Sequence, residues 1–232
     1  MHPKLKELGL DKTAAYILSC QQSSGAILWN PGEKLDPWDH VEAAMGLTVA
    51  GHFDAAKRAF DWLAAHQSSD GSWPNSFYGE PTAALLKETN FIAYCATGLW
   101  HFYSVTSDRE FLSSHFAMIE RAIDYVLNYQ QSEGDIAWAV NHNNEAEPDA
   151  LLTACSSIAR SIECAIKCAE TVNKPKPKWA SAHRSLANAI KHKPERFDRT
   201  WESKARFAMD WYYPILAAVS YTHLRAHETT SH

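Results

Sequence analysis

The chain has 232 residues, of which 46% are hydrophobic and 21% charged, and its formal net charge is −5. This composition is that of an ordinary globular protein, and the acidic balance excludes the basic surface of a nucleic-acid-binding protein. No stretch approaches the roughly 18 apolar residues of a membrane span, and the N-terminal segment lacks the apolar region of a signal peptide. The five cysteines form no disulfide-like framework, so we expect reduced thiols and a cytoplasmic protein.

Apolar residues recur with the helical period along most of the chain. Helices are predicted, in chain order, over residues 11–21, 37–50, 53–66, 89–105, 108–130, 148–171, 178–192 and 203–219. The first, third, fifth and seventh are amphipathic, whereas the other four are apolar or lined with small residues on nearly every face. A helix that is apolar all round must be surrounded by protein. The alternation therefore predicts an all-α fold of the α/α-toroid type, in which outer helices cover a ring of inner helices.

The predicted loops differ in length according to the helix that follows them. Long loops lead into the inner helices, over residues 22–36, 67–88, 131–147 and 193–202, whereas the links back to the outer helices are short. All the long loops therefore gather at one rim, over the N-termini of the inner helices. Because binding sites are often built from loops on a rigid scaffold, we expect the functional site at this rim.

A short motif recurs where three of the outer helices end. In each copy a glutamine is followed four residues later by a glycine: Gln21 and Gly25, Gln67 and Gly71, and Gln130 and Gly134. Glycine readily adopts the left-handed turn that follows a helix end, and the glutamine amide can bond to a loop or a helix end. We interpret the motif as a structural joint that marks the hairpins of the toroid.

The middle copy, Gln67-x-x-x-Gly71-x-Trp73, resembles the QW motif of the prenyltransferase and squalene-cyclase repeat family, whose members fold as α/α toroids. The resemblance covers roughly residues 10–219. It implies an isoprenoid substrate and a pocket at the N-termini of the inner helices.

Three further stretches are similar to a bacterial group that is labelled prenyltransferase from such repeats: DPWDHVE (36–42), ETNF (88–91) and MDWYYP (209–214). The chain nevertheless departs from the family where the chemistry is concerned. It contains neither the Asp-x-Asp-Asp acid of the cyclases nor the Asp-x-Cys zinc-ligand pair of the protein prenyltransferases. The resemblance therefore predicts the fold more strongly than the reaction.

The predicted helices form four hairpins, whereas toroids of this kind usually close with six, so we expect an incomplete toroid. After Val219 the helical pattern stops, and the chain ends in the polar, aperiodic stretch SYTHLRAHETTSH. We expect one toroid domain over residues 1–219 and a non-native or disordered tail over residues 220–232, with the natural protein continuing further.

The second predicted helix opens with polar residues ahead of small and apolar ones. Asp36 precedes it as the expected N-cap, and Asp39, His40 and Glu42 follow in its first turns. Buried charge is costly unless it is paired or hydrated, so these side chains either face a polar cavity or form satisfied structural pairs. We take Asp39, His40 and Glu42 as candidate catalytic residues.

A fourth candidate catalytic residue lies in the eighth predicted helix. Asp210 belongs to an aromatic stretch and precedes Pro214 by one helical turn. Proline cannot donate the hydrogen bond that the carbonyl of Asp210 would accept, so a kink is expected beside this acid.

Aromatic and polar side chains at the same rim are the candidate substrate-binding residues: Trp29, Trp38, Glu88, Asn90, Tyr94, Trp138 and Tyr212. Aromatic rings with two carboxylates suit a sugar, where one carboxylic acid protonates the leaving oxygen and the other acts as base or nucleophile. The same groups suit a carbocation, which the aromatic faces stabilise. The sequence does not choose between these chemistries, because the separation of the carboxylates is not visible in it.

Three functions are considered, the first from the resemblance and the other two from these residues. The first is an enzyme of the prenyltransferase and squalene-cyclase repeat family, the second a six-hairpin carbohydrate-active enzyme (hydrolase or epimerase-like), and the third a non-catalytic binding toroid. The expected ligand is a small molecule, either an isoprenoid or a carbohydrate. No zinc-site spacing, phosphate-binding loop or nucleophile elbow occurs, so we expect no metal and no cofactor. The oligomeric state is left open.

Overall fold

The computed structural model describes residues 10–77, 86–200 and 208–217, and this part of the chain is almost entirely helical. The α-helices are α2 (Leu10–Cys20), α3 (Pro37–Val49), α4 (Phe53–Ala65), α5 (Thr89–Thr106), α6 (Arg109–Leu127), α7 (Leu152–Thr171), α8 (Pro177–His192) and α9 (Ala208–Leu216). A 3-10 turn, η1 (Pro194–Arg196), and two short strands, β1 (Lys87–Glu88) and β2 (Ala139–Val140), complete the described elements. The predicted all-α fold is confirmed. None of the described helices is long and apolar enough to cross a membrane.

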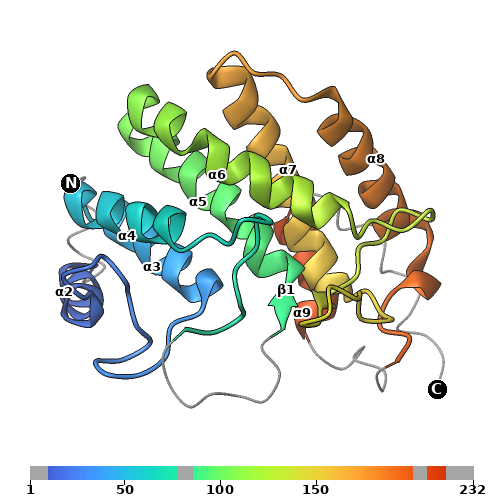
Figure 1. Cartoon of the computed structure of the whole chain (residues 1–232), viewed down its shortest axis with the longest axis horizontal. Coiled ribbons are helices and arrows are strands. Elements are labelled where there is room, and N and C mark those ends of the chain that lie inside the picture. Colours follow the sequence, from blue (N-terminus) through green and yellow to red (C-terminus); the bar gives the residue numbers. More distant parts are fainter. Residues whose placement is uncertain (1–9, 78–85, 201–207, 218–232) are drawn as a thin grey trace.

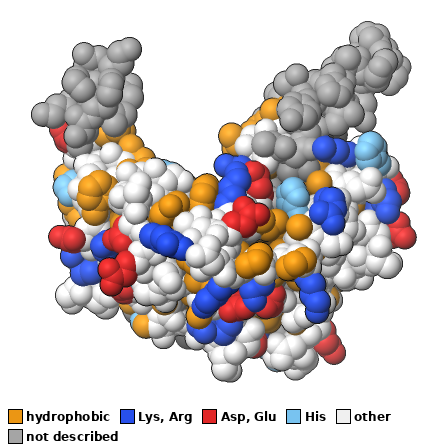
Figure 2. Space-filling model, turned by 90° about the horizontal axis from the view of Figure 1, so that it is seen from above, with side chains coloured by type: hydrophobic (Ala, Val, Ile, Leu, Met, Phe, Trp, Pro, Cys, Tyr) orange, Lys and Arg blue, Asp and Glu red, His pale blue; other side chains and the backbone are white. Residues whose placement is uncertain are grey.

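The helices form two layers that alternate along the chain. Helices α3, α5, α7 and α9 pack against one another in this order, and α2, α4, α6 and α8 lie on the outside of the row (Figure 1). Four hairpins thus form a partial α/α toroid, as predicted, and the coloured surface in Figure 2 is hollowed on its upper side. The predicted domain limit at residue 219 and the tail over residues 220–232 lie outside the described residues.

The long loops meet at one rim, and backbone hydrogen bonds link each loop to the next. Leu35 and Phe77 pair in an antiparallel bridge, β1 pairs with β2, and the N–H of Asp198 donates to the carbonyl of Ala150 at 2.8 Å. The rim is therefore a continuous layer over the N-termini of the inner helices. Strands β1 and β2 have two residues each, too few for any alternation to reveal them in the sequence.

The three glutamine–glycine motifs are structural joints, as predicted. Each glutamine amide donates to the carbonyl of its own glycine and to a carbonyl on the next outer helix. The two donor–acceptor distances are 3.1 and 2.9 Å for Gln21, 2.9 and 3.1 Å for Gln67, and 3.0 and 3.0 Å for Gln130. The glycines have φ angles of +101°, +96° and +100° in chain order. The joints therefore fasten each of these outer helices to the following one.

Gly71→Ala is expected to lower the free energy of unfolding by about 2–3 kcal/mol in urea titrations, because strain and a clash add up. The residue has a φ of +96°, and an added Cβ would lie 2.4 Å from the carbonyl oxygen of Arg121 on α6. Gly32→Ala is the matched control. Gly32 has a φ of +85°, but no described atom lies within 4 Å of the added Cβ, so only the left-handed conformation costs energy, about 1 kcal/mol. Equal losses in the two variants would contradict the tight docking of the joint.

Candidate functional site

Two adjoining cavities lie between the inner helices, with volumes of about 220 and about 130 Å³. Trp38, Ser157 and Tyr213 line both, so we treat the two as one central cavity, walled by α3, α5, α7 and α9. Together the two volumes fall at the lower end of the range of small-molecule sites. In the described part of the chain, no group of three or more His, Cys, Asp or Glu side chains is placed to hold a metal ion.

An aromatic stack carries a carboxylate on one wall of the central cavity. The rings of Trp38 and Tyr94 lie with their centroids 3.8 Å apart and their planes 11° apart. The hydroxyl of Tyr94 donates to Oε1 of Glu42 at 3.1 Å. Burial and the negative charge of Glu42 both raise the pKa of Tyr94, so the phenol keeps its proton and remains a donor. Asn90 lines the same cavity from the first turn of α5, so the structure brings four predicted residues together.

Asp36 caps α3, as predicted. It is buried, its Oδ1 accepts from the backbone N–H of Asp39 at 2.8 Å, and its Oδ2 accepts from the indole N–H of Trp29 at 2.7 Å. Both oxygens are thus used in fixing the start of the helix and the orientation of Trp29. Trp29 itself is 43% exposed, and the ammonium of Lys34 lies 3.7 Å from its ring centroid.

Asp39 is an exposed acid in the first turn of α3. It lines a separate cavity of about 320 Å³ between α2 and α3, together with Tyr16 and Trp29. Partial burial of the carboxyl raises the pKa of Asp39 to about 6, and the negative charges of Asp36 and Glu42 act in the same direction. A carboxyl with this pKa is partly protonated near neutral pH, so it can donate a proton to a substrate.

The surroundings of His40 match the second alternative considered for it, a satisfied structural residue. It is 1% exposed, its Nδ1 accepts from the backbone N–H of Ile27 at 3.1 Å, and its Nε2 donates to the carbonyl of Ala59 at 2.9 Å. Burial lowers the pKa of His40 to about 4, so the ring is neutral at physiological pH. The ring thus joins the loop between α2 and α3 to α4, and both of its nitrogens are hydrogen-bonded to the backbone.

Two predicted binding residues belong to the rim layer. Glu88 is half-buried and accepts from Nδ2 of Asn75 at 3.3 Å. Burial raises the pKa of Glu88 and outweighs the hydrogen bond from Asn75, which acts in the opposite direction. Trp138 is half-buried, and its carbonyl accepts from the backbone N–H of Thr89 at 3.0 Å. A role in ligand binding stays a prediction for both residues.

Helix α9 carries the remaining predicted residues. Tyr212 is 36% exposed, and its ring centroid lies 5.3 Å from that of Tyr213. Asp210 lies in α9 one turn before Pro214, but its side chain is outside the described part of the structure. Its catalytic role therefore stays a prediction.

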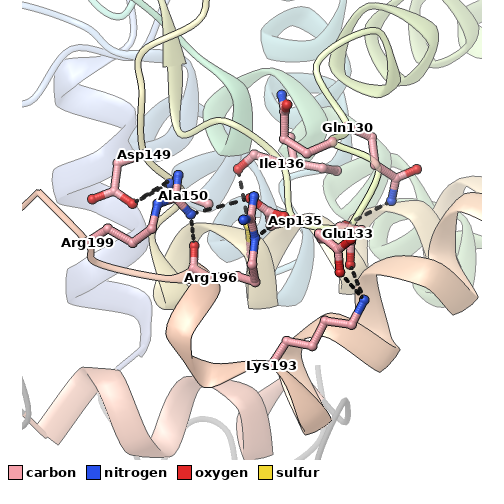
Figure 3. Close-up of polar contacts among 12 residues, drawn as sticks. Gln130, Glu133, Asp135, Ile136, Asp149, Ala150, Lys193, Arg196 and Arg199 are labelled. Carbon is pink, nitrogen blue, oxygen red and sulfur yellow. Dashed lines mark hydrogen bonds and ion pairs between the residues drawn. The ribbon is translucent and has the colours of Figure 1, made fainter.

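Four charged side chains connect the loop between α6 and α7 to the segment after α8. We call them the charge clamp: Asp135, Asp149, Arg196 and Arg199 (Figure 3). Asp135 is buried, and the guanidinium of Arg196 donates to its two oxygens at 3.0 and 3.2 Å. A nitrogen of Arg199 lies 3.5 Å from the same carboxylate. The clamp thereby holds the wall of a further cavity of about 210 Å³.

Asp149 belongs to the loop before α7, because the helix predicted from residue 148 begins only at Leu152. The backbone N–H and the hydroxyl of Thr200 both donate to Oδ2 of Asp149 at 2.8 Å. Burial alone would raise the pKa of Asp149, but these hydrogen bonds outweigh it and hold the pKa below its ordinary value. The stability that this residue contributes is therefore present above a pH of about 4 and is lost as the pH falls through the folded-state pKa.

Sequence reasoning missed several residues that line the central cavity, among them Ser157, Arg160 and Tyr213. Arg160 is a charged residue in an inner helix, and its Nη1 donates to Oε2 of Glu163 at 2.7 Å. The rule that singled out Glu42, a charge on an otherwise small and apolar helix, would also have found Arg160. Ser157 gives no such signal, because serine is common among small residues in packed helices.

Comparison with known proteins gives one related sequence and several similar structures. No family model matches the chain. The chain is 43% identical over 205 residues to the MMP endo-(1,4)-3-O-methyl-alpha-D-mannosidase of Mycolicibacterium hassiacum, a match that covers 88% of this chain and 56% of that protein. The chain thus spans little more than half the length of this curated relative.

The similar solved structures share the fold at low sequence identity. A D-mannose isomerase matches with a TM-score of 0.63 and 16% identity, covering 82% of this chain and 51% of its own. An unsaturated glucuronyl hydrolase specific for heparin matches with a TM-score of 0.60 and 17% identity, covering 78% and 54%. A possible GH105 member from Salmonella enterica matches with a TM-score of 0.62 and 10% identity, covering 84% and 56%.

These findings overturn the expected membership of the prenyltransferase and squalene-cyclase repeat family. The related sequence is an endo-mannosidase. The similar structures named above are carbohydrate-active proteins and not prenyltransferases. The α/α-toroid fold that the resemblance implied is nevertheless the fold of this chain.

Proposed function

We propose that this chain is a glycoside hydrolase that cleaves α-(1→4)-linked mannose chains, with Asp39 as the general acid. The observation that carries the proposal is the sequence identity to an endo-mannosidase, and the exposed carboxyl of Asp39, which lines a cavity with Trp29 and has a raised pKa, supports its role as the acid. The 43% identity to an endo-mannosidase supports the linkage and the sugar. The second of the three functions considered from the sequence, a carbohydrate-active enzyme, is therefore favoured.

Cleavage of a glycosidic bond needs a proton on the leaving oxygen, and a carboxylic acid with a raised pKa is the usual donor. Asp39 meets two requirements of this role. Its side chain is exposed, so a substrate can reach it, and its pKa keeps part of the population protonated near neutral pH. Trp29, which Asp36 orients, offers an exposed aromatic surface beside the acid, where a sugar ring can pack.

The second carboxylate of such a reaction activates a water molecule or attacks the sugar itself. Glu42 is the candidate on α3, because it is exposed and its charge interacts with Asp39. Asp210 on α9 is the candidate from the opposite end of the row of inner helices. Replacing each by its amide distinguishes them, since only the variant that lacks the second carboxylate loses turnover.

We expect the protein to shorten α-(1→4)-linked mannose oligosaccharides, with and without 3-O-methyl groups, during incubation near pH 6. Mass spectrometry of the products would follow the cleavage, and proton NMR would report the anomeric form that is released first. Cello-oligosaccharides, which have β-linked glucose, serve as the control and should stay intact. If mannose oligosaccharides of both kinds also stay intact, the proposed function is wrong.

A further inference from the structure

A buried hydroxyl group at the central cavity has no partner within the described part of the protein. Ser157 is 5% exposed, and its Oγ accepts and donates no hydrogen bond there. Two other serines of α7 are satisfied: Ser156 donates to the carbonyl of Leu152 at 2.7 Å, and Ser161 pairs with the hydroxyl of Thr97 at 3.0 Å. A buried polar group without a partner costs free energy and calls for an explanation.

The position of Ser157 supplies that explanation. It lines both parts of the central cavity, with Trp38 on α3 and Tyr213 on α9 as the other two shared walls. A serine in a helix can satisfy itself by bonding to the carbonyl four residues earlier, as Ser156 does. Ser157 does not, and its hydroxyl stays available to whatever fills the cavity.

We propose that the central cavity binds an uncharged pyranose ring and that Ser157 recognises one of its hydroxyl groups. Trp38 and Tyr213 supply aromatic walls, and Glu42, held by Tyr94, supplies an acceptor on the same side as Trp38. A serine hydroxyl both donates and accepts, which suits a sugar hydroxyl. That the ligand is a sugar rests on the proposed function.

The charges around the cavity select a neutral ring over a uronic acid. The guanidinium of Arg160 is the cationic group among the described lining residues, and Glu163 already neutralises it at 2.7 Å. Glu42 adds a negative charge to the opposite wall, which repels a carboxylate.

Calorimetric titration with a neutral α-(1→4)-linked mannose oligosaccharide tests the proposal in the Asp39→Asn background, where turnover should be about 1,000-fold slower. Adding Ser157→Ala should weaken binding about 10-fold, the effect of losing one hydrogen bond. The melting temperature should stay equal or rise, because the substitution removes an unsatisfied buried hydroxyl. Adding Ser156→Ala, the matched control, should leave the affinity unchanged. A mannuronate oligosaccharide should bind more weakly than the neutral one.

The outcomes separate this proposal from the proposed function. Binding that depends on Ser157 without any cleavage by the unmodified protein would refute the hydrolase and leave the sugar site in place. In the active protein, Ser157→Ala should raise KM about 10-fold and change kcat little. Cleavage with an unchanged KM and an unchanged affinity in Ser157→Ala would overturn the role of this residue. Equal or tighter binding of mannuronate would overturn the selectivity for a neutral ring.

Discussion

Asp39→Asn is expected to lower kcat/KM for α-(1→4)-linked mannose oligosaccharides about 1,000-fold, in the range found when a general acid is removed. The amide keeps the shape of the side chain but cannot protonate the leaving oxygen. The measurement is the initial rate of oligosaccharide cleavage at pH 6. Asp54→Asn is the matched control, because Asp54 is an exposed acid in the first turn of an outer helix, α4. Its cleavage rate should equal that of the unmodified protein.

The same substitution should not destabilise the fold, so that a loss of activity can be assigned to chemistry. A carboxyl whose pKa is raised on folding contributes stability below its unfolded pKa of about 4, and this contribution is lost as the pH rises through about 6. At pH 8 the ionised Asp39 therefore opposes folding, and Asp39→Asn should be at least as stable as the unmodified protein. Urea unfolding at pH 8 measures this, and a marked loss of stability would contradict the pKa assignment.

Asp135→Ala is expected to lower the free energy of unfolding by about 2–3 kcal/mol, because a buried carboxylate and its charged hydrogen bonds are lost while the guanidinium left behind still reaches the solvent. The substitution leaves the guanidinium of Arg196 facing a space that no longer holds its carboxylate (Figure 3). It also removes the contact with Arg199. Chemical denaturation followed by circular dichroism would measure the loss.

Glu133→Ala is the control for the clamp, because it breaks a second ion pair between the same two segments. Glu133 and Lys193 lie 2.8 Å apart, but both side chains reach the solvent, so their pairing is worth about 0–1 kcal/mol. A loss in Asp135→Ala as small as in Glu133→Ala would show that the buried clamp contributes no more than a surface pair.

Much of the fold could be predicted from the sequence, because helical periodicity reports burial directly. The inner helices are apolar on nearly every face since protein surrounds them, and the long loops mark the rim. The glutamine–glycine motif was also interpreted correctly as a joint. The family inferred from it was wrong for a physical reason: the amide of Gln67 ties one outer helix to the next, so the motif follows toroid geometry and carries no information about chemistry.

The candidate site was predicted only in part, because polar side chains on one helix can point to different neighbours. Glu42 faces the central cavity, whereas His40, two residues earlier, is buried and bonded to backbone on two sides. Whether such a residue is satisfied depends on Ile27 and Ala59, which the sequence does not place beside it. Ser157 could not be predicted from the sequence either. Only the folded structure shows that its hydroxyl is buried without a partner among the described residues.

The pH dependence of kcat/KM on mannose oligosaccharides tests the central claim, that Asp39 is the general acid, most directly. A general acid must be protonated to act, so the alkaline limb of the profile should bend at a pH of about 6 and then fall about tenfold per pH unit. The residual activity of Asp39→Asn should show no such bend. A rate that stays constant from about pH 5 to about pH 8 in the unmodified protein, or an identical bend in Asp39→Asn, would contradict the assignment.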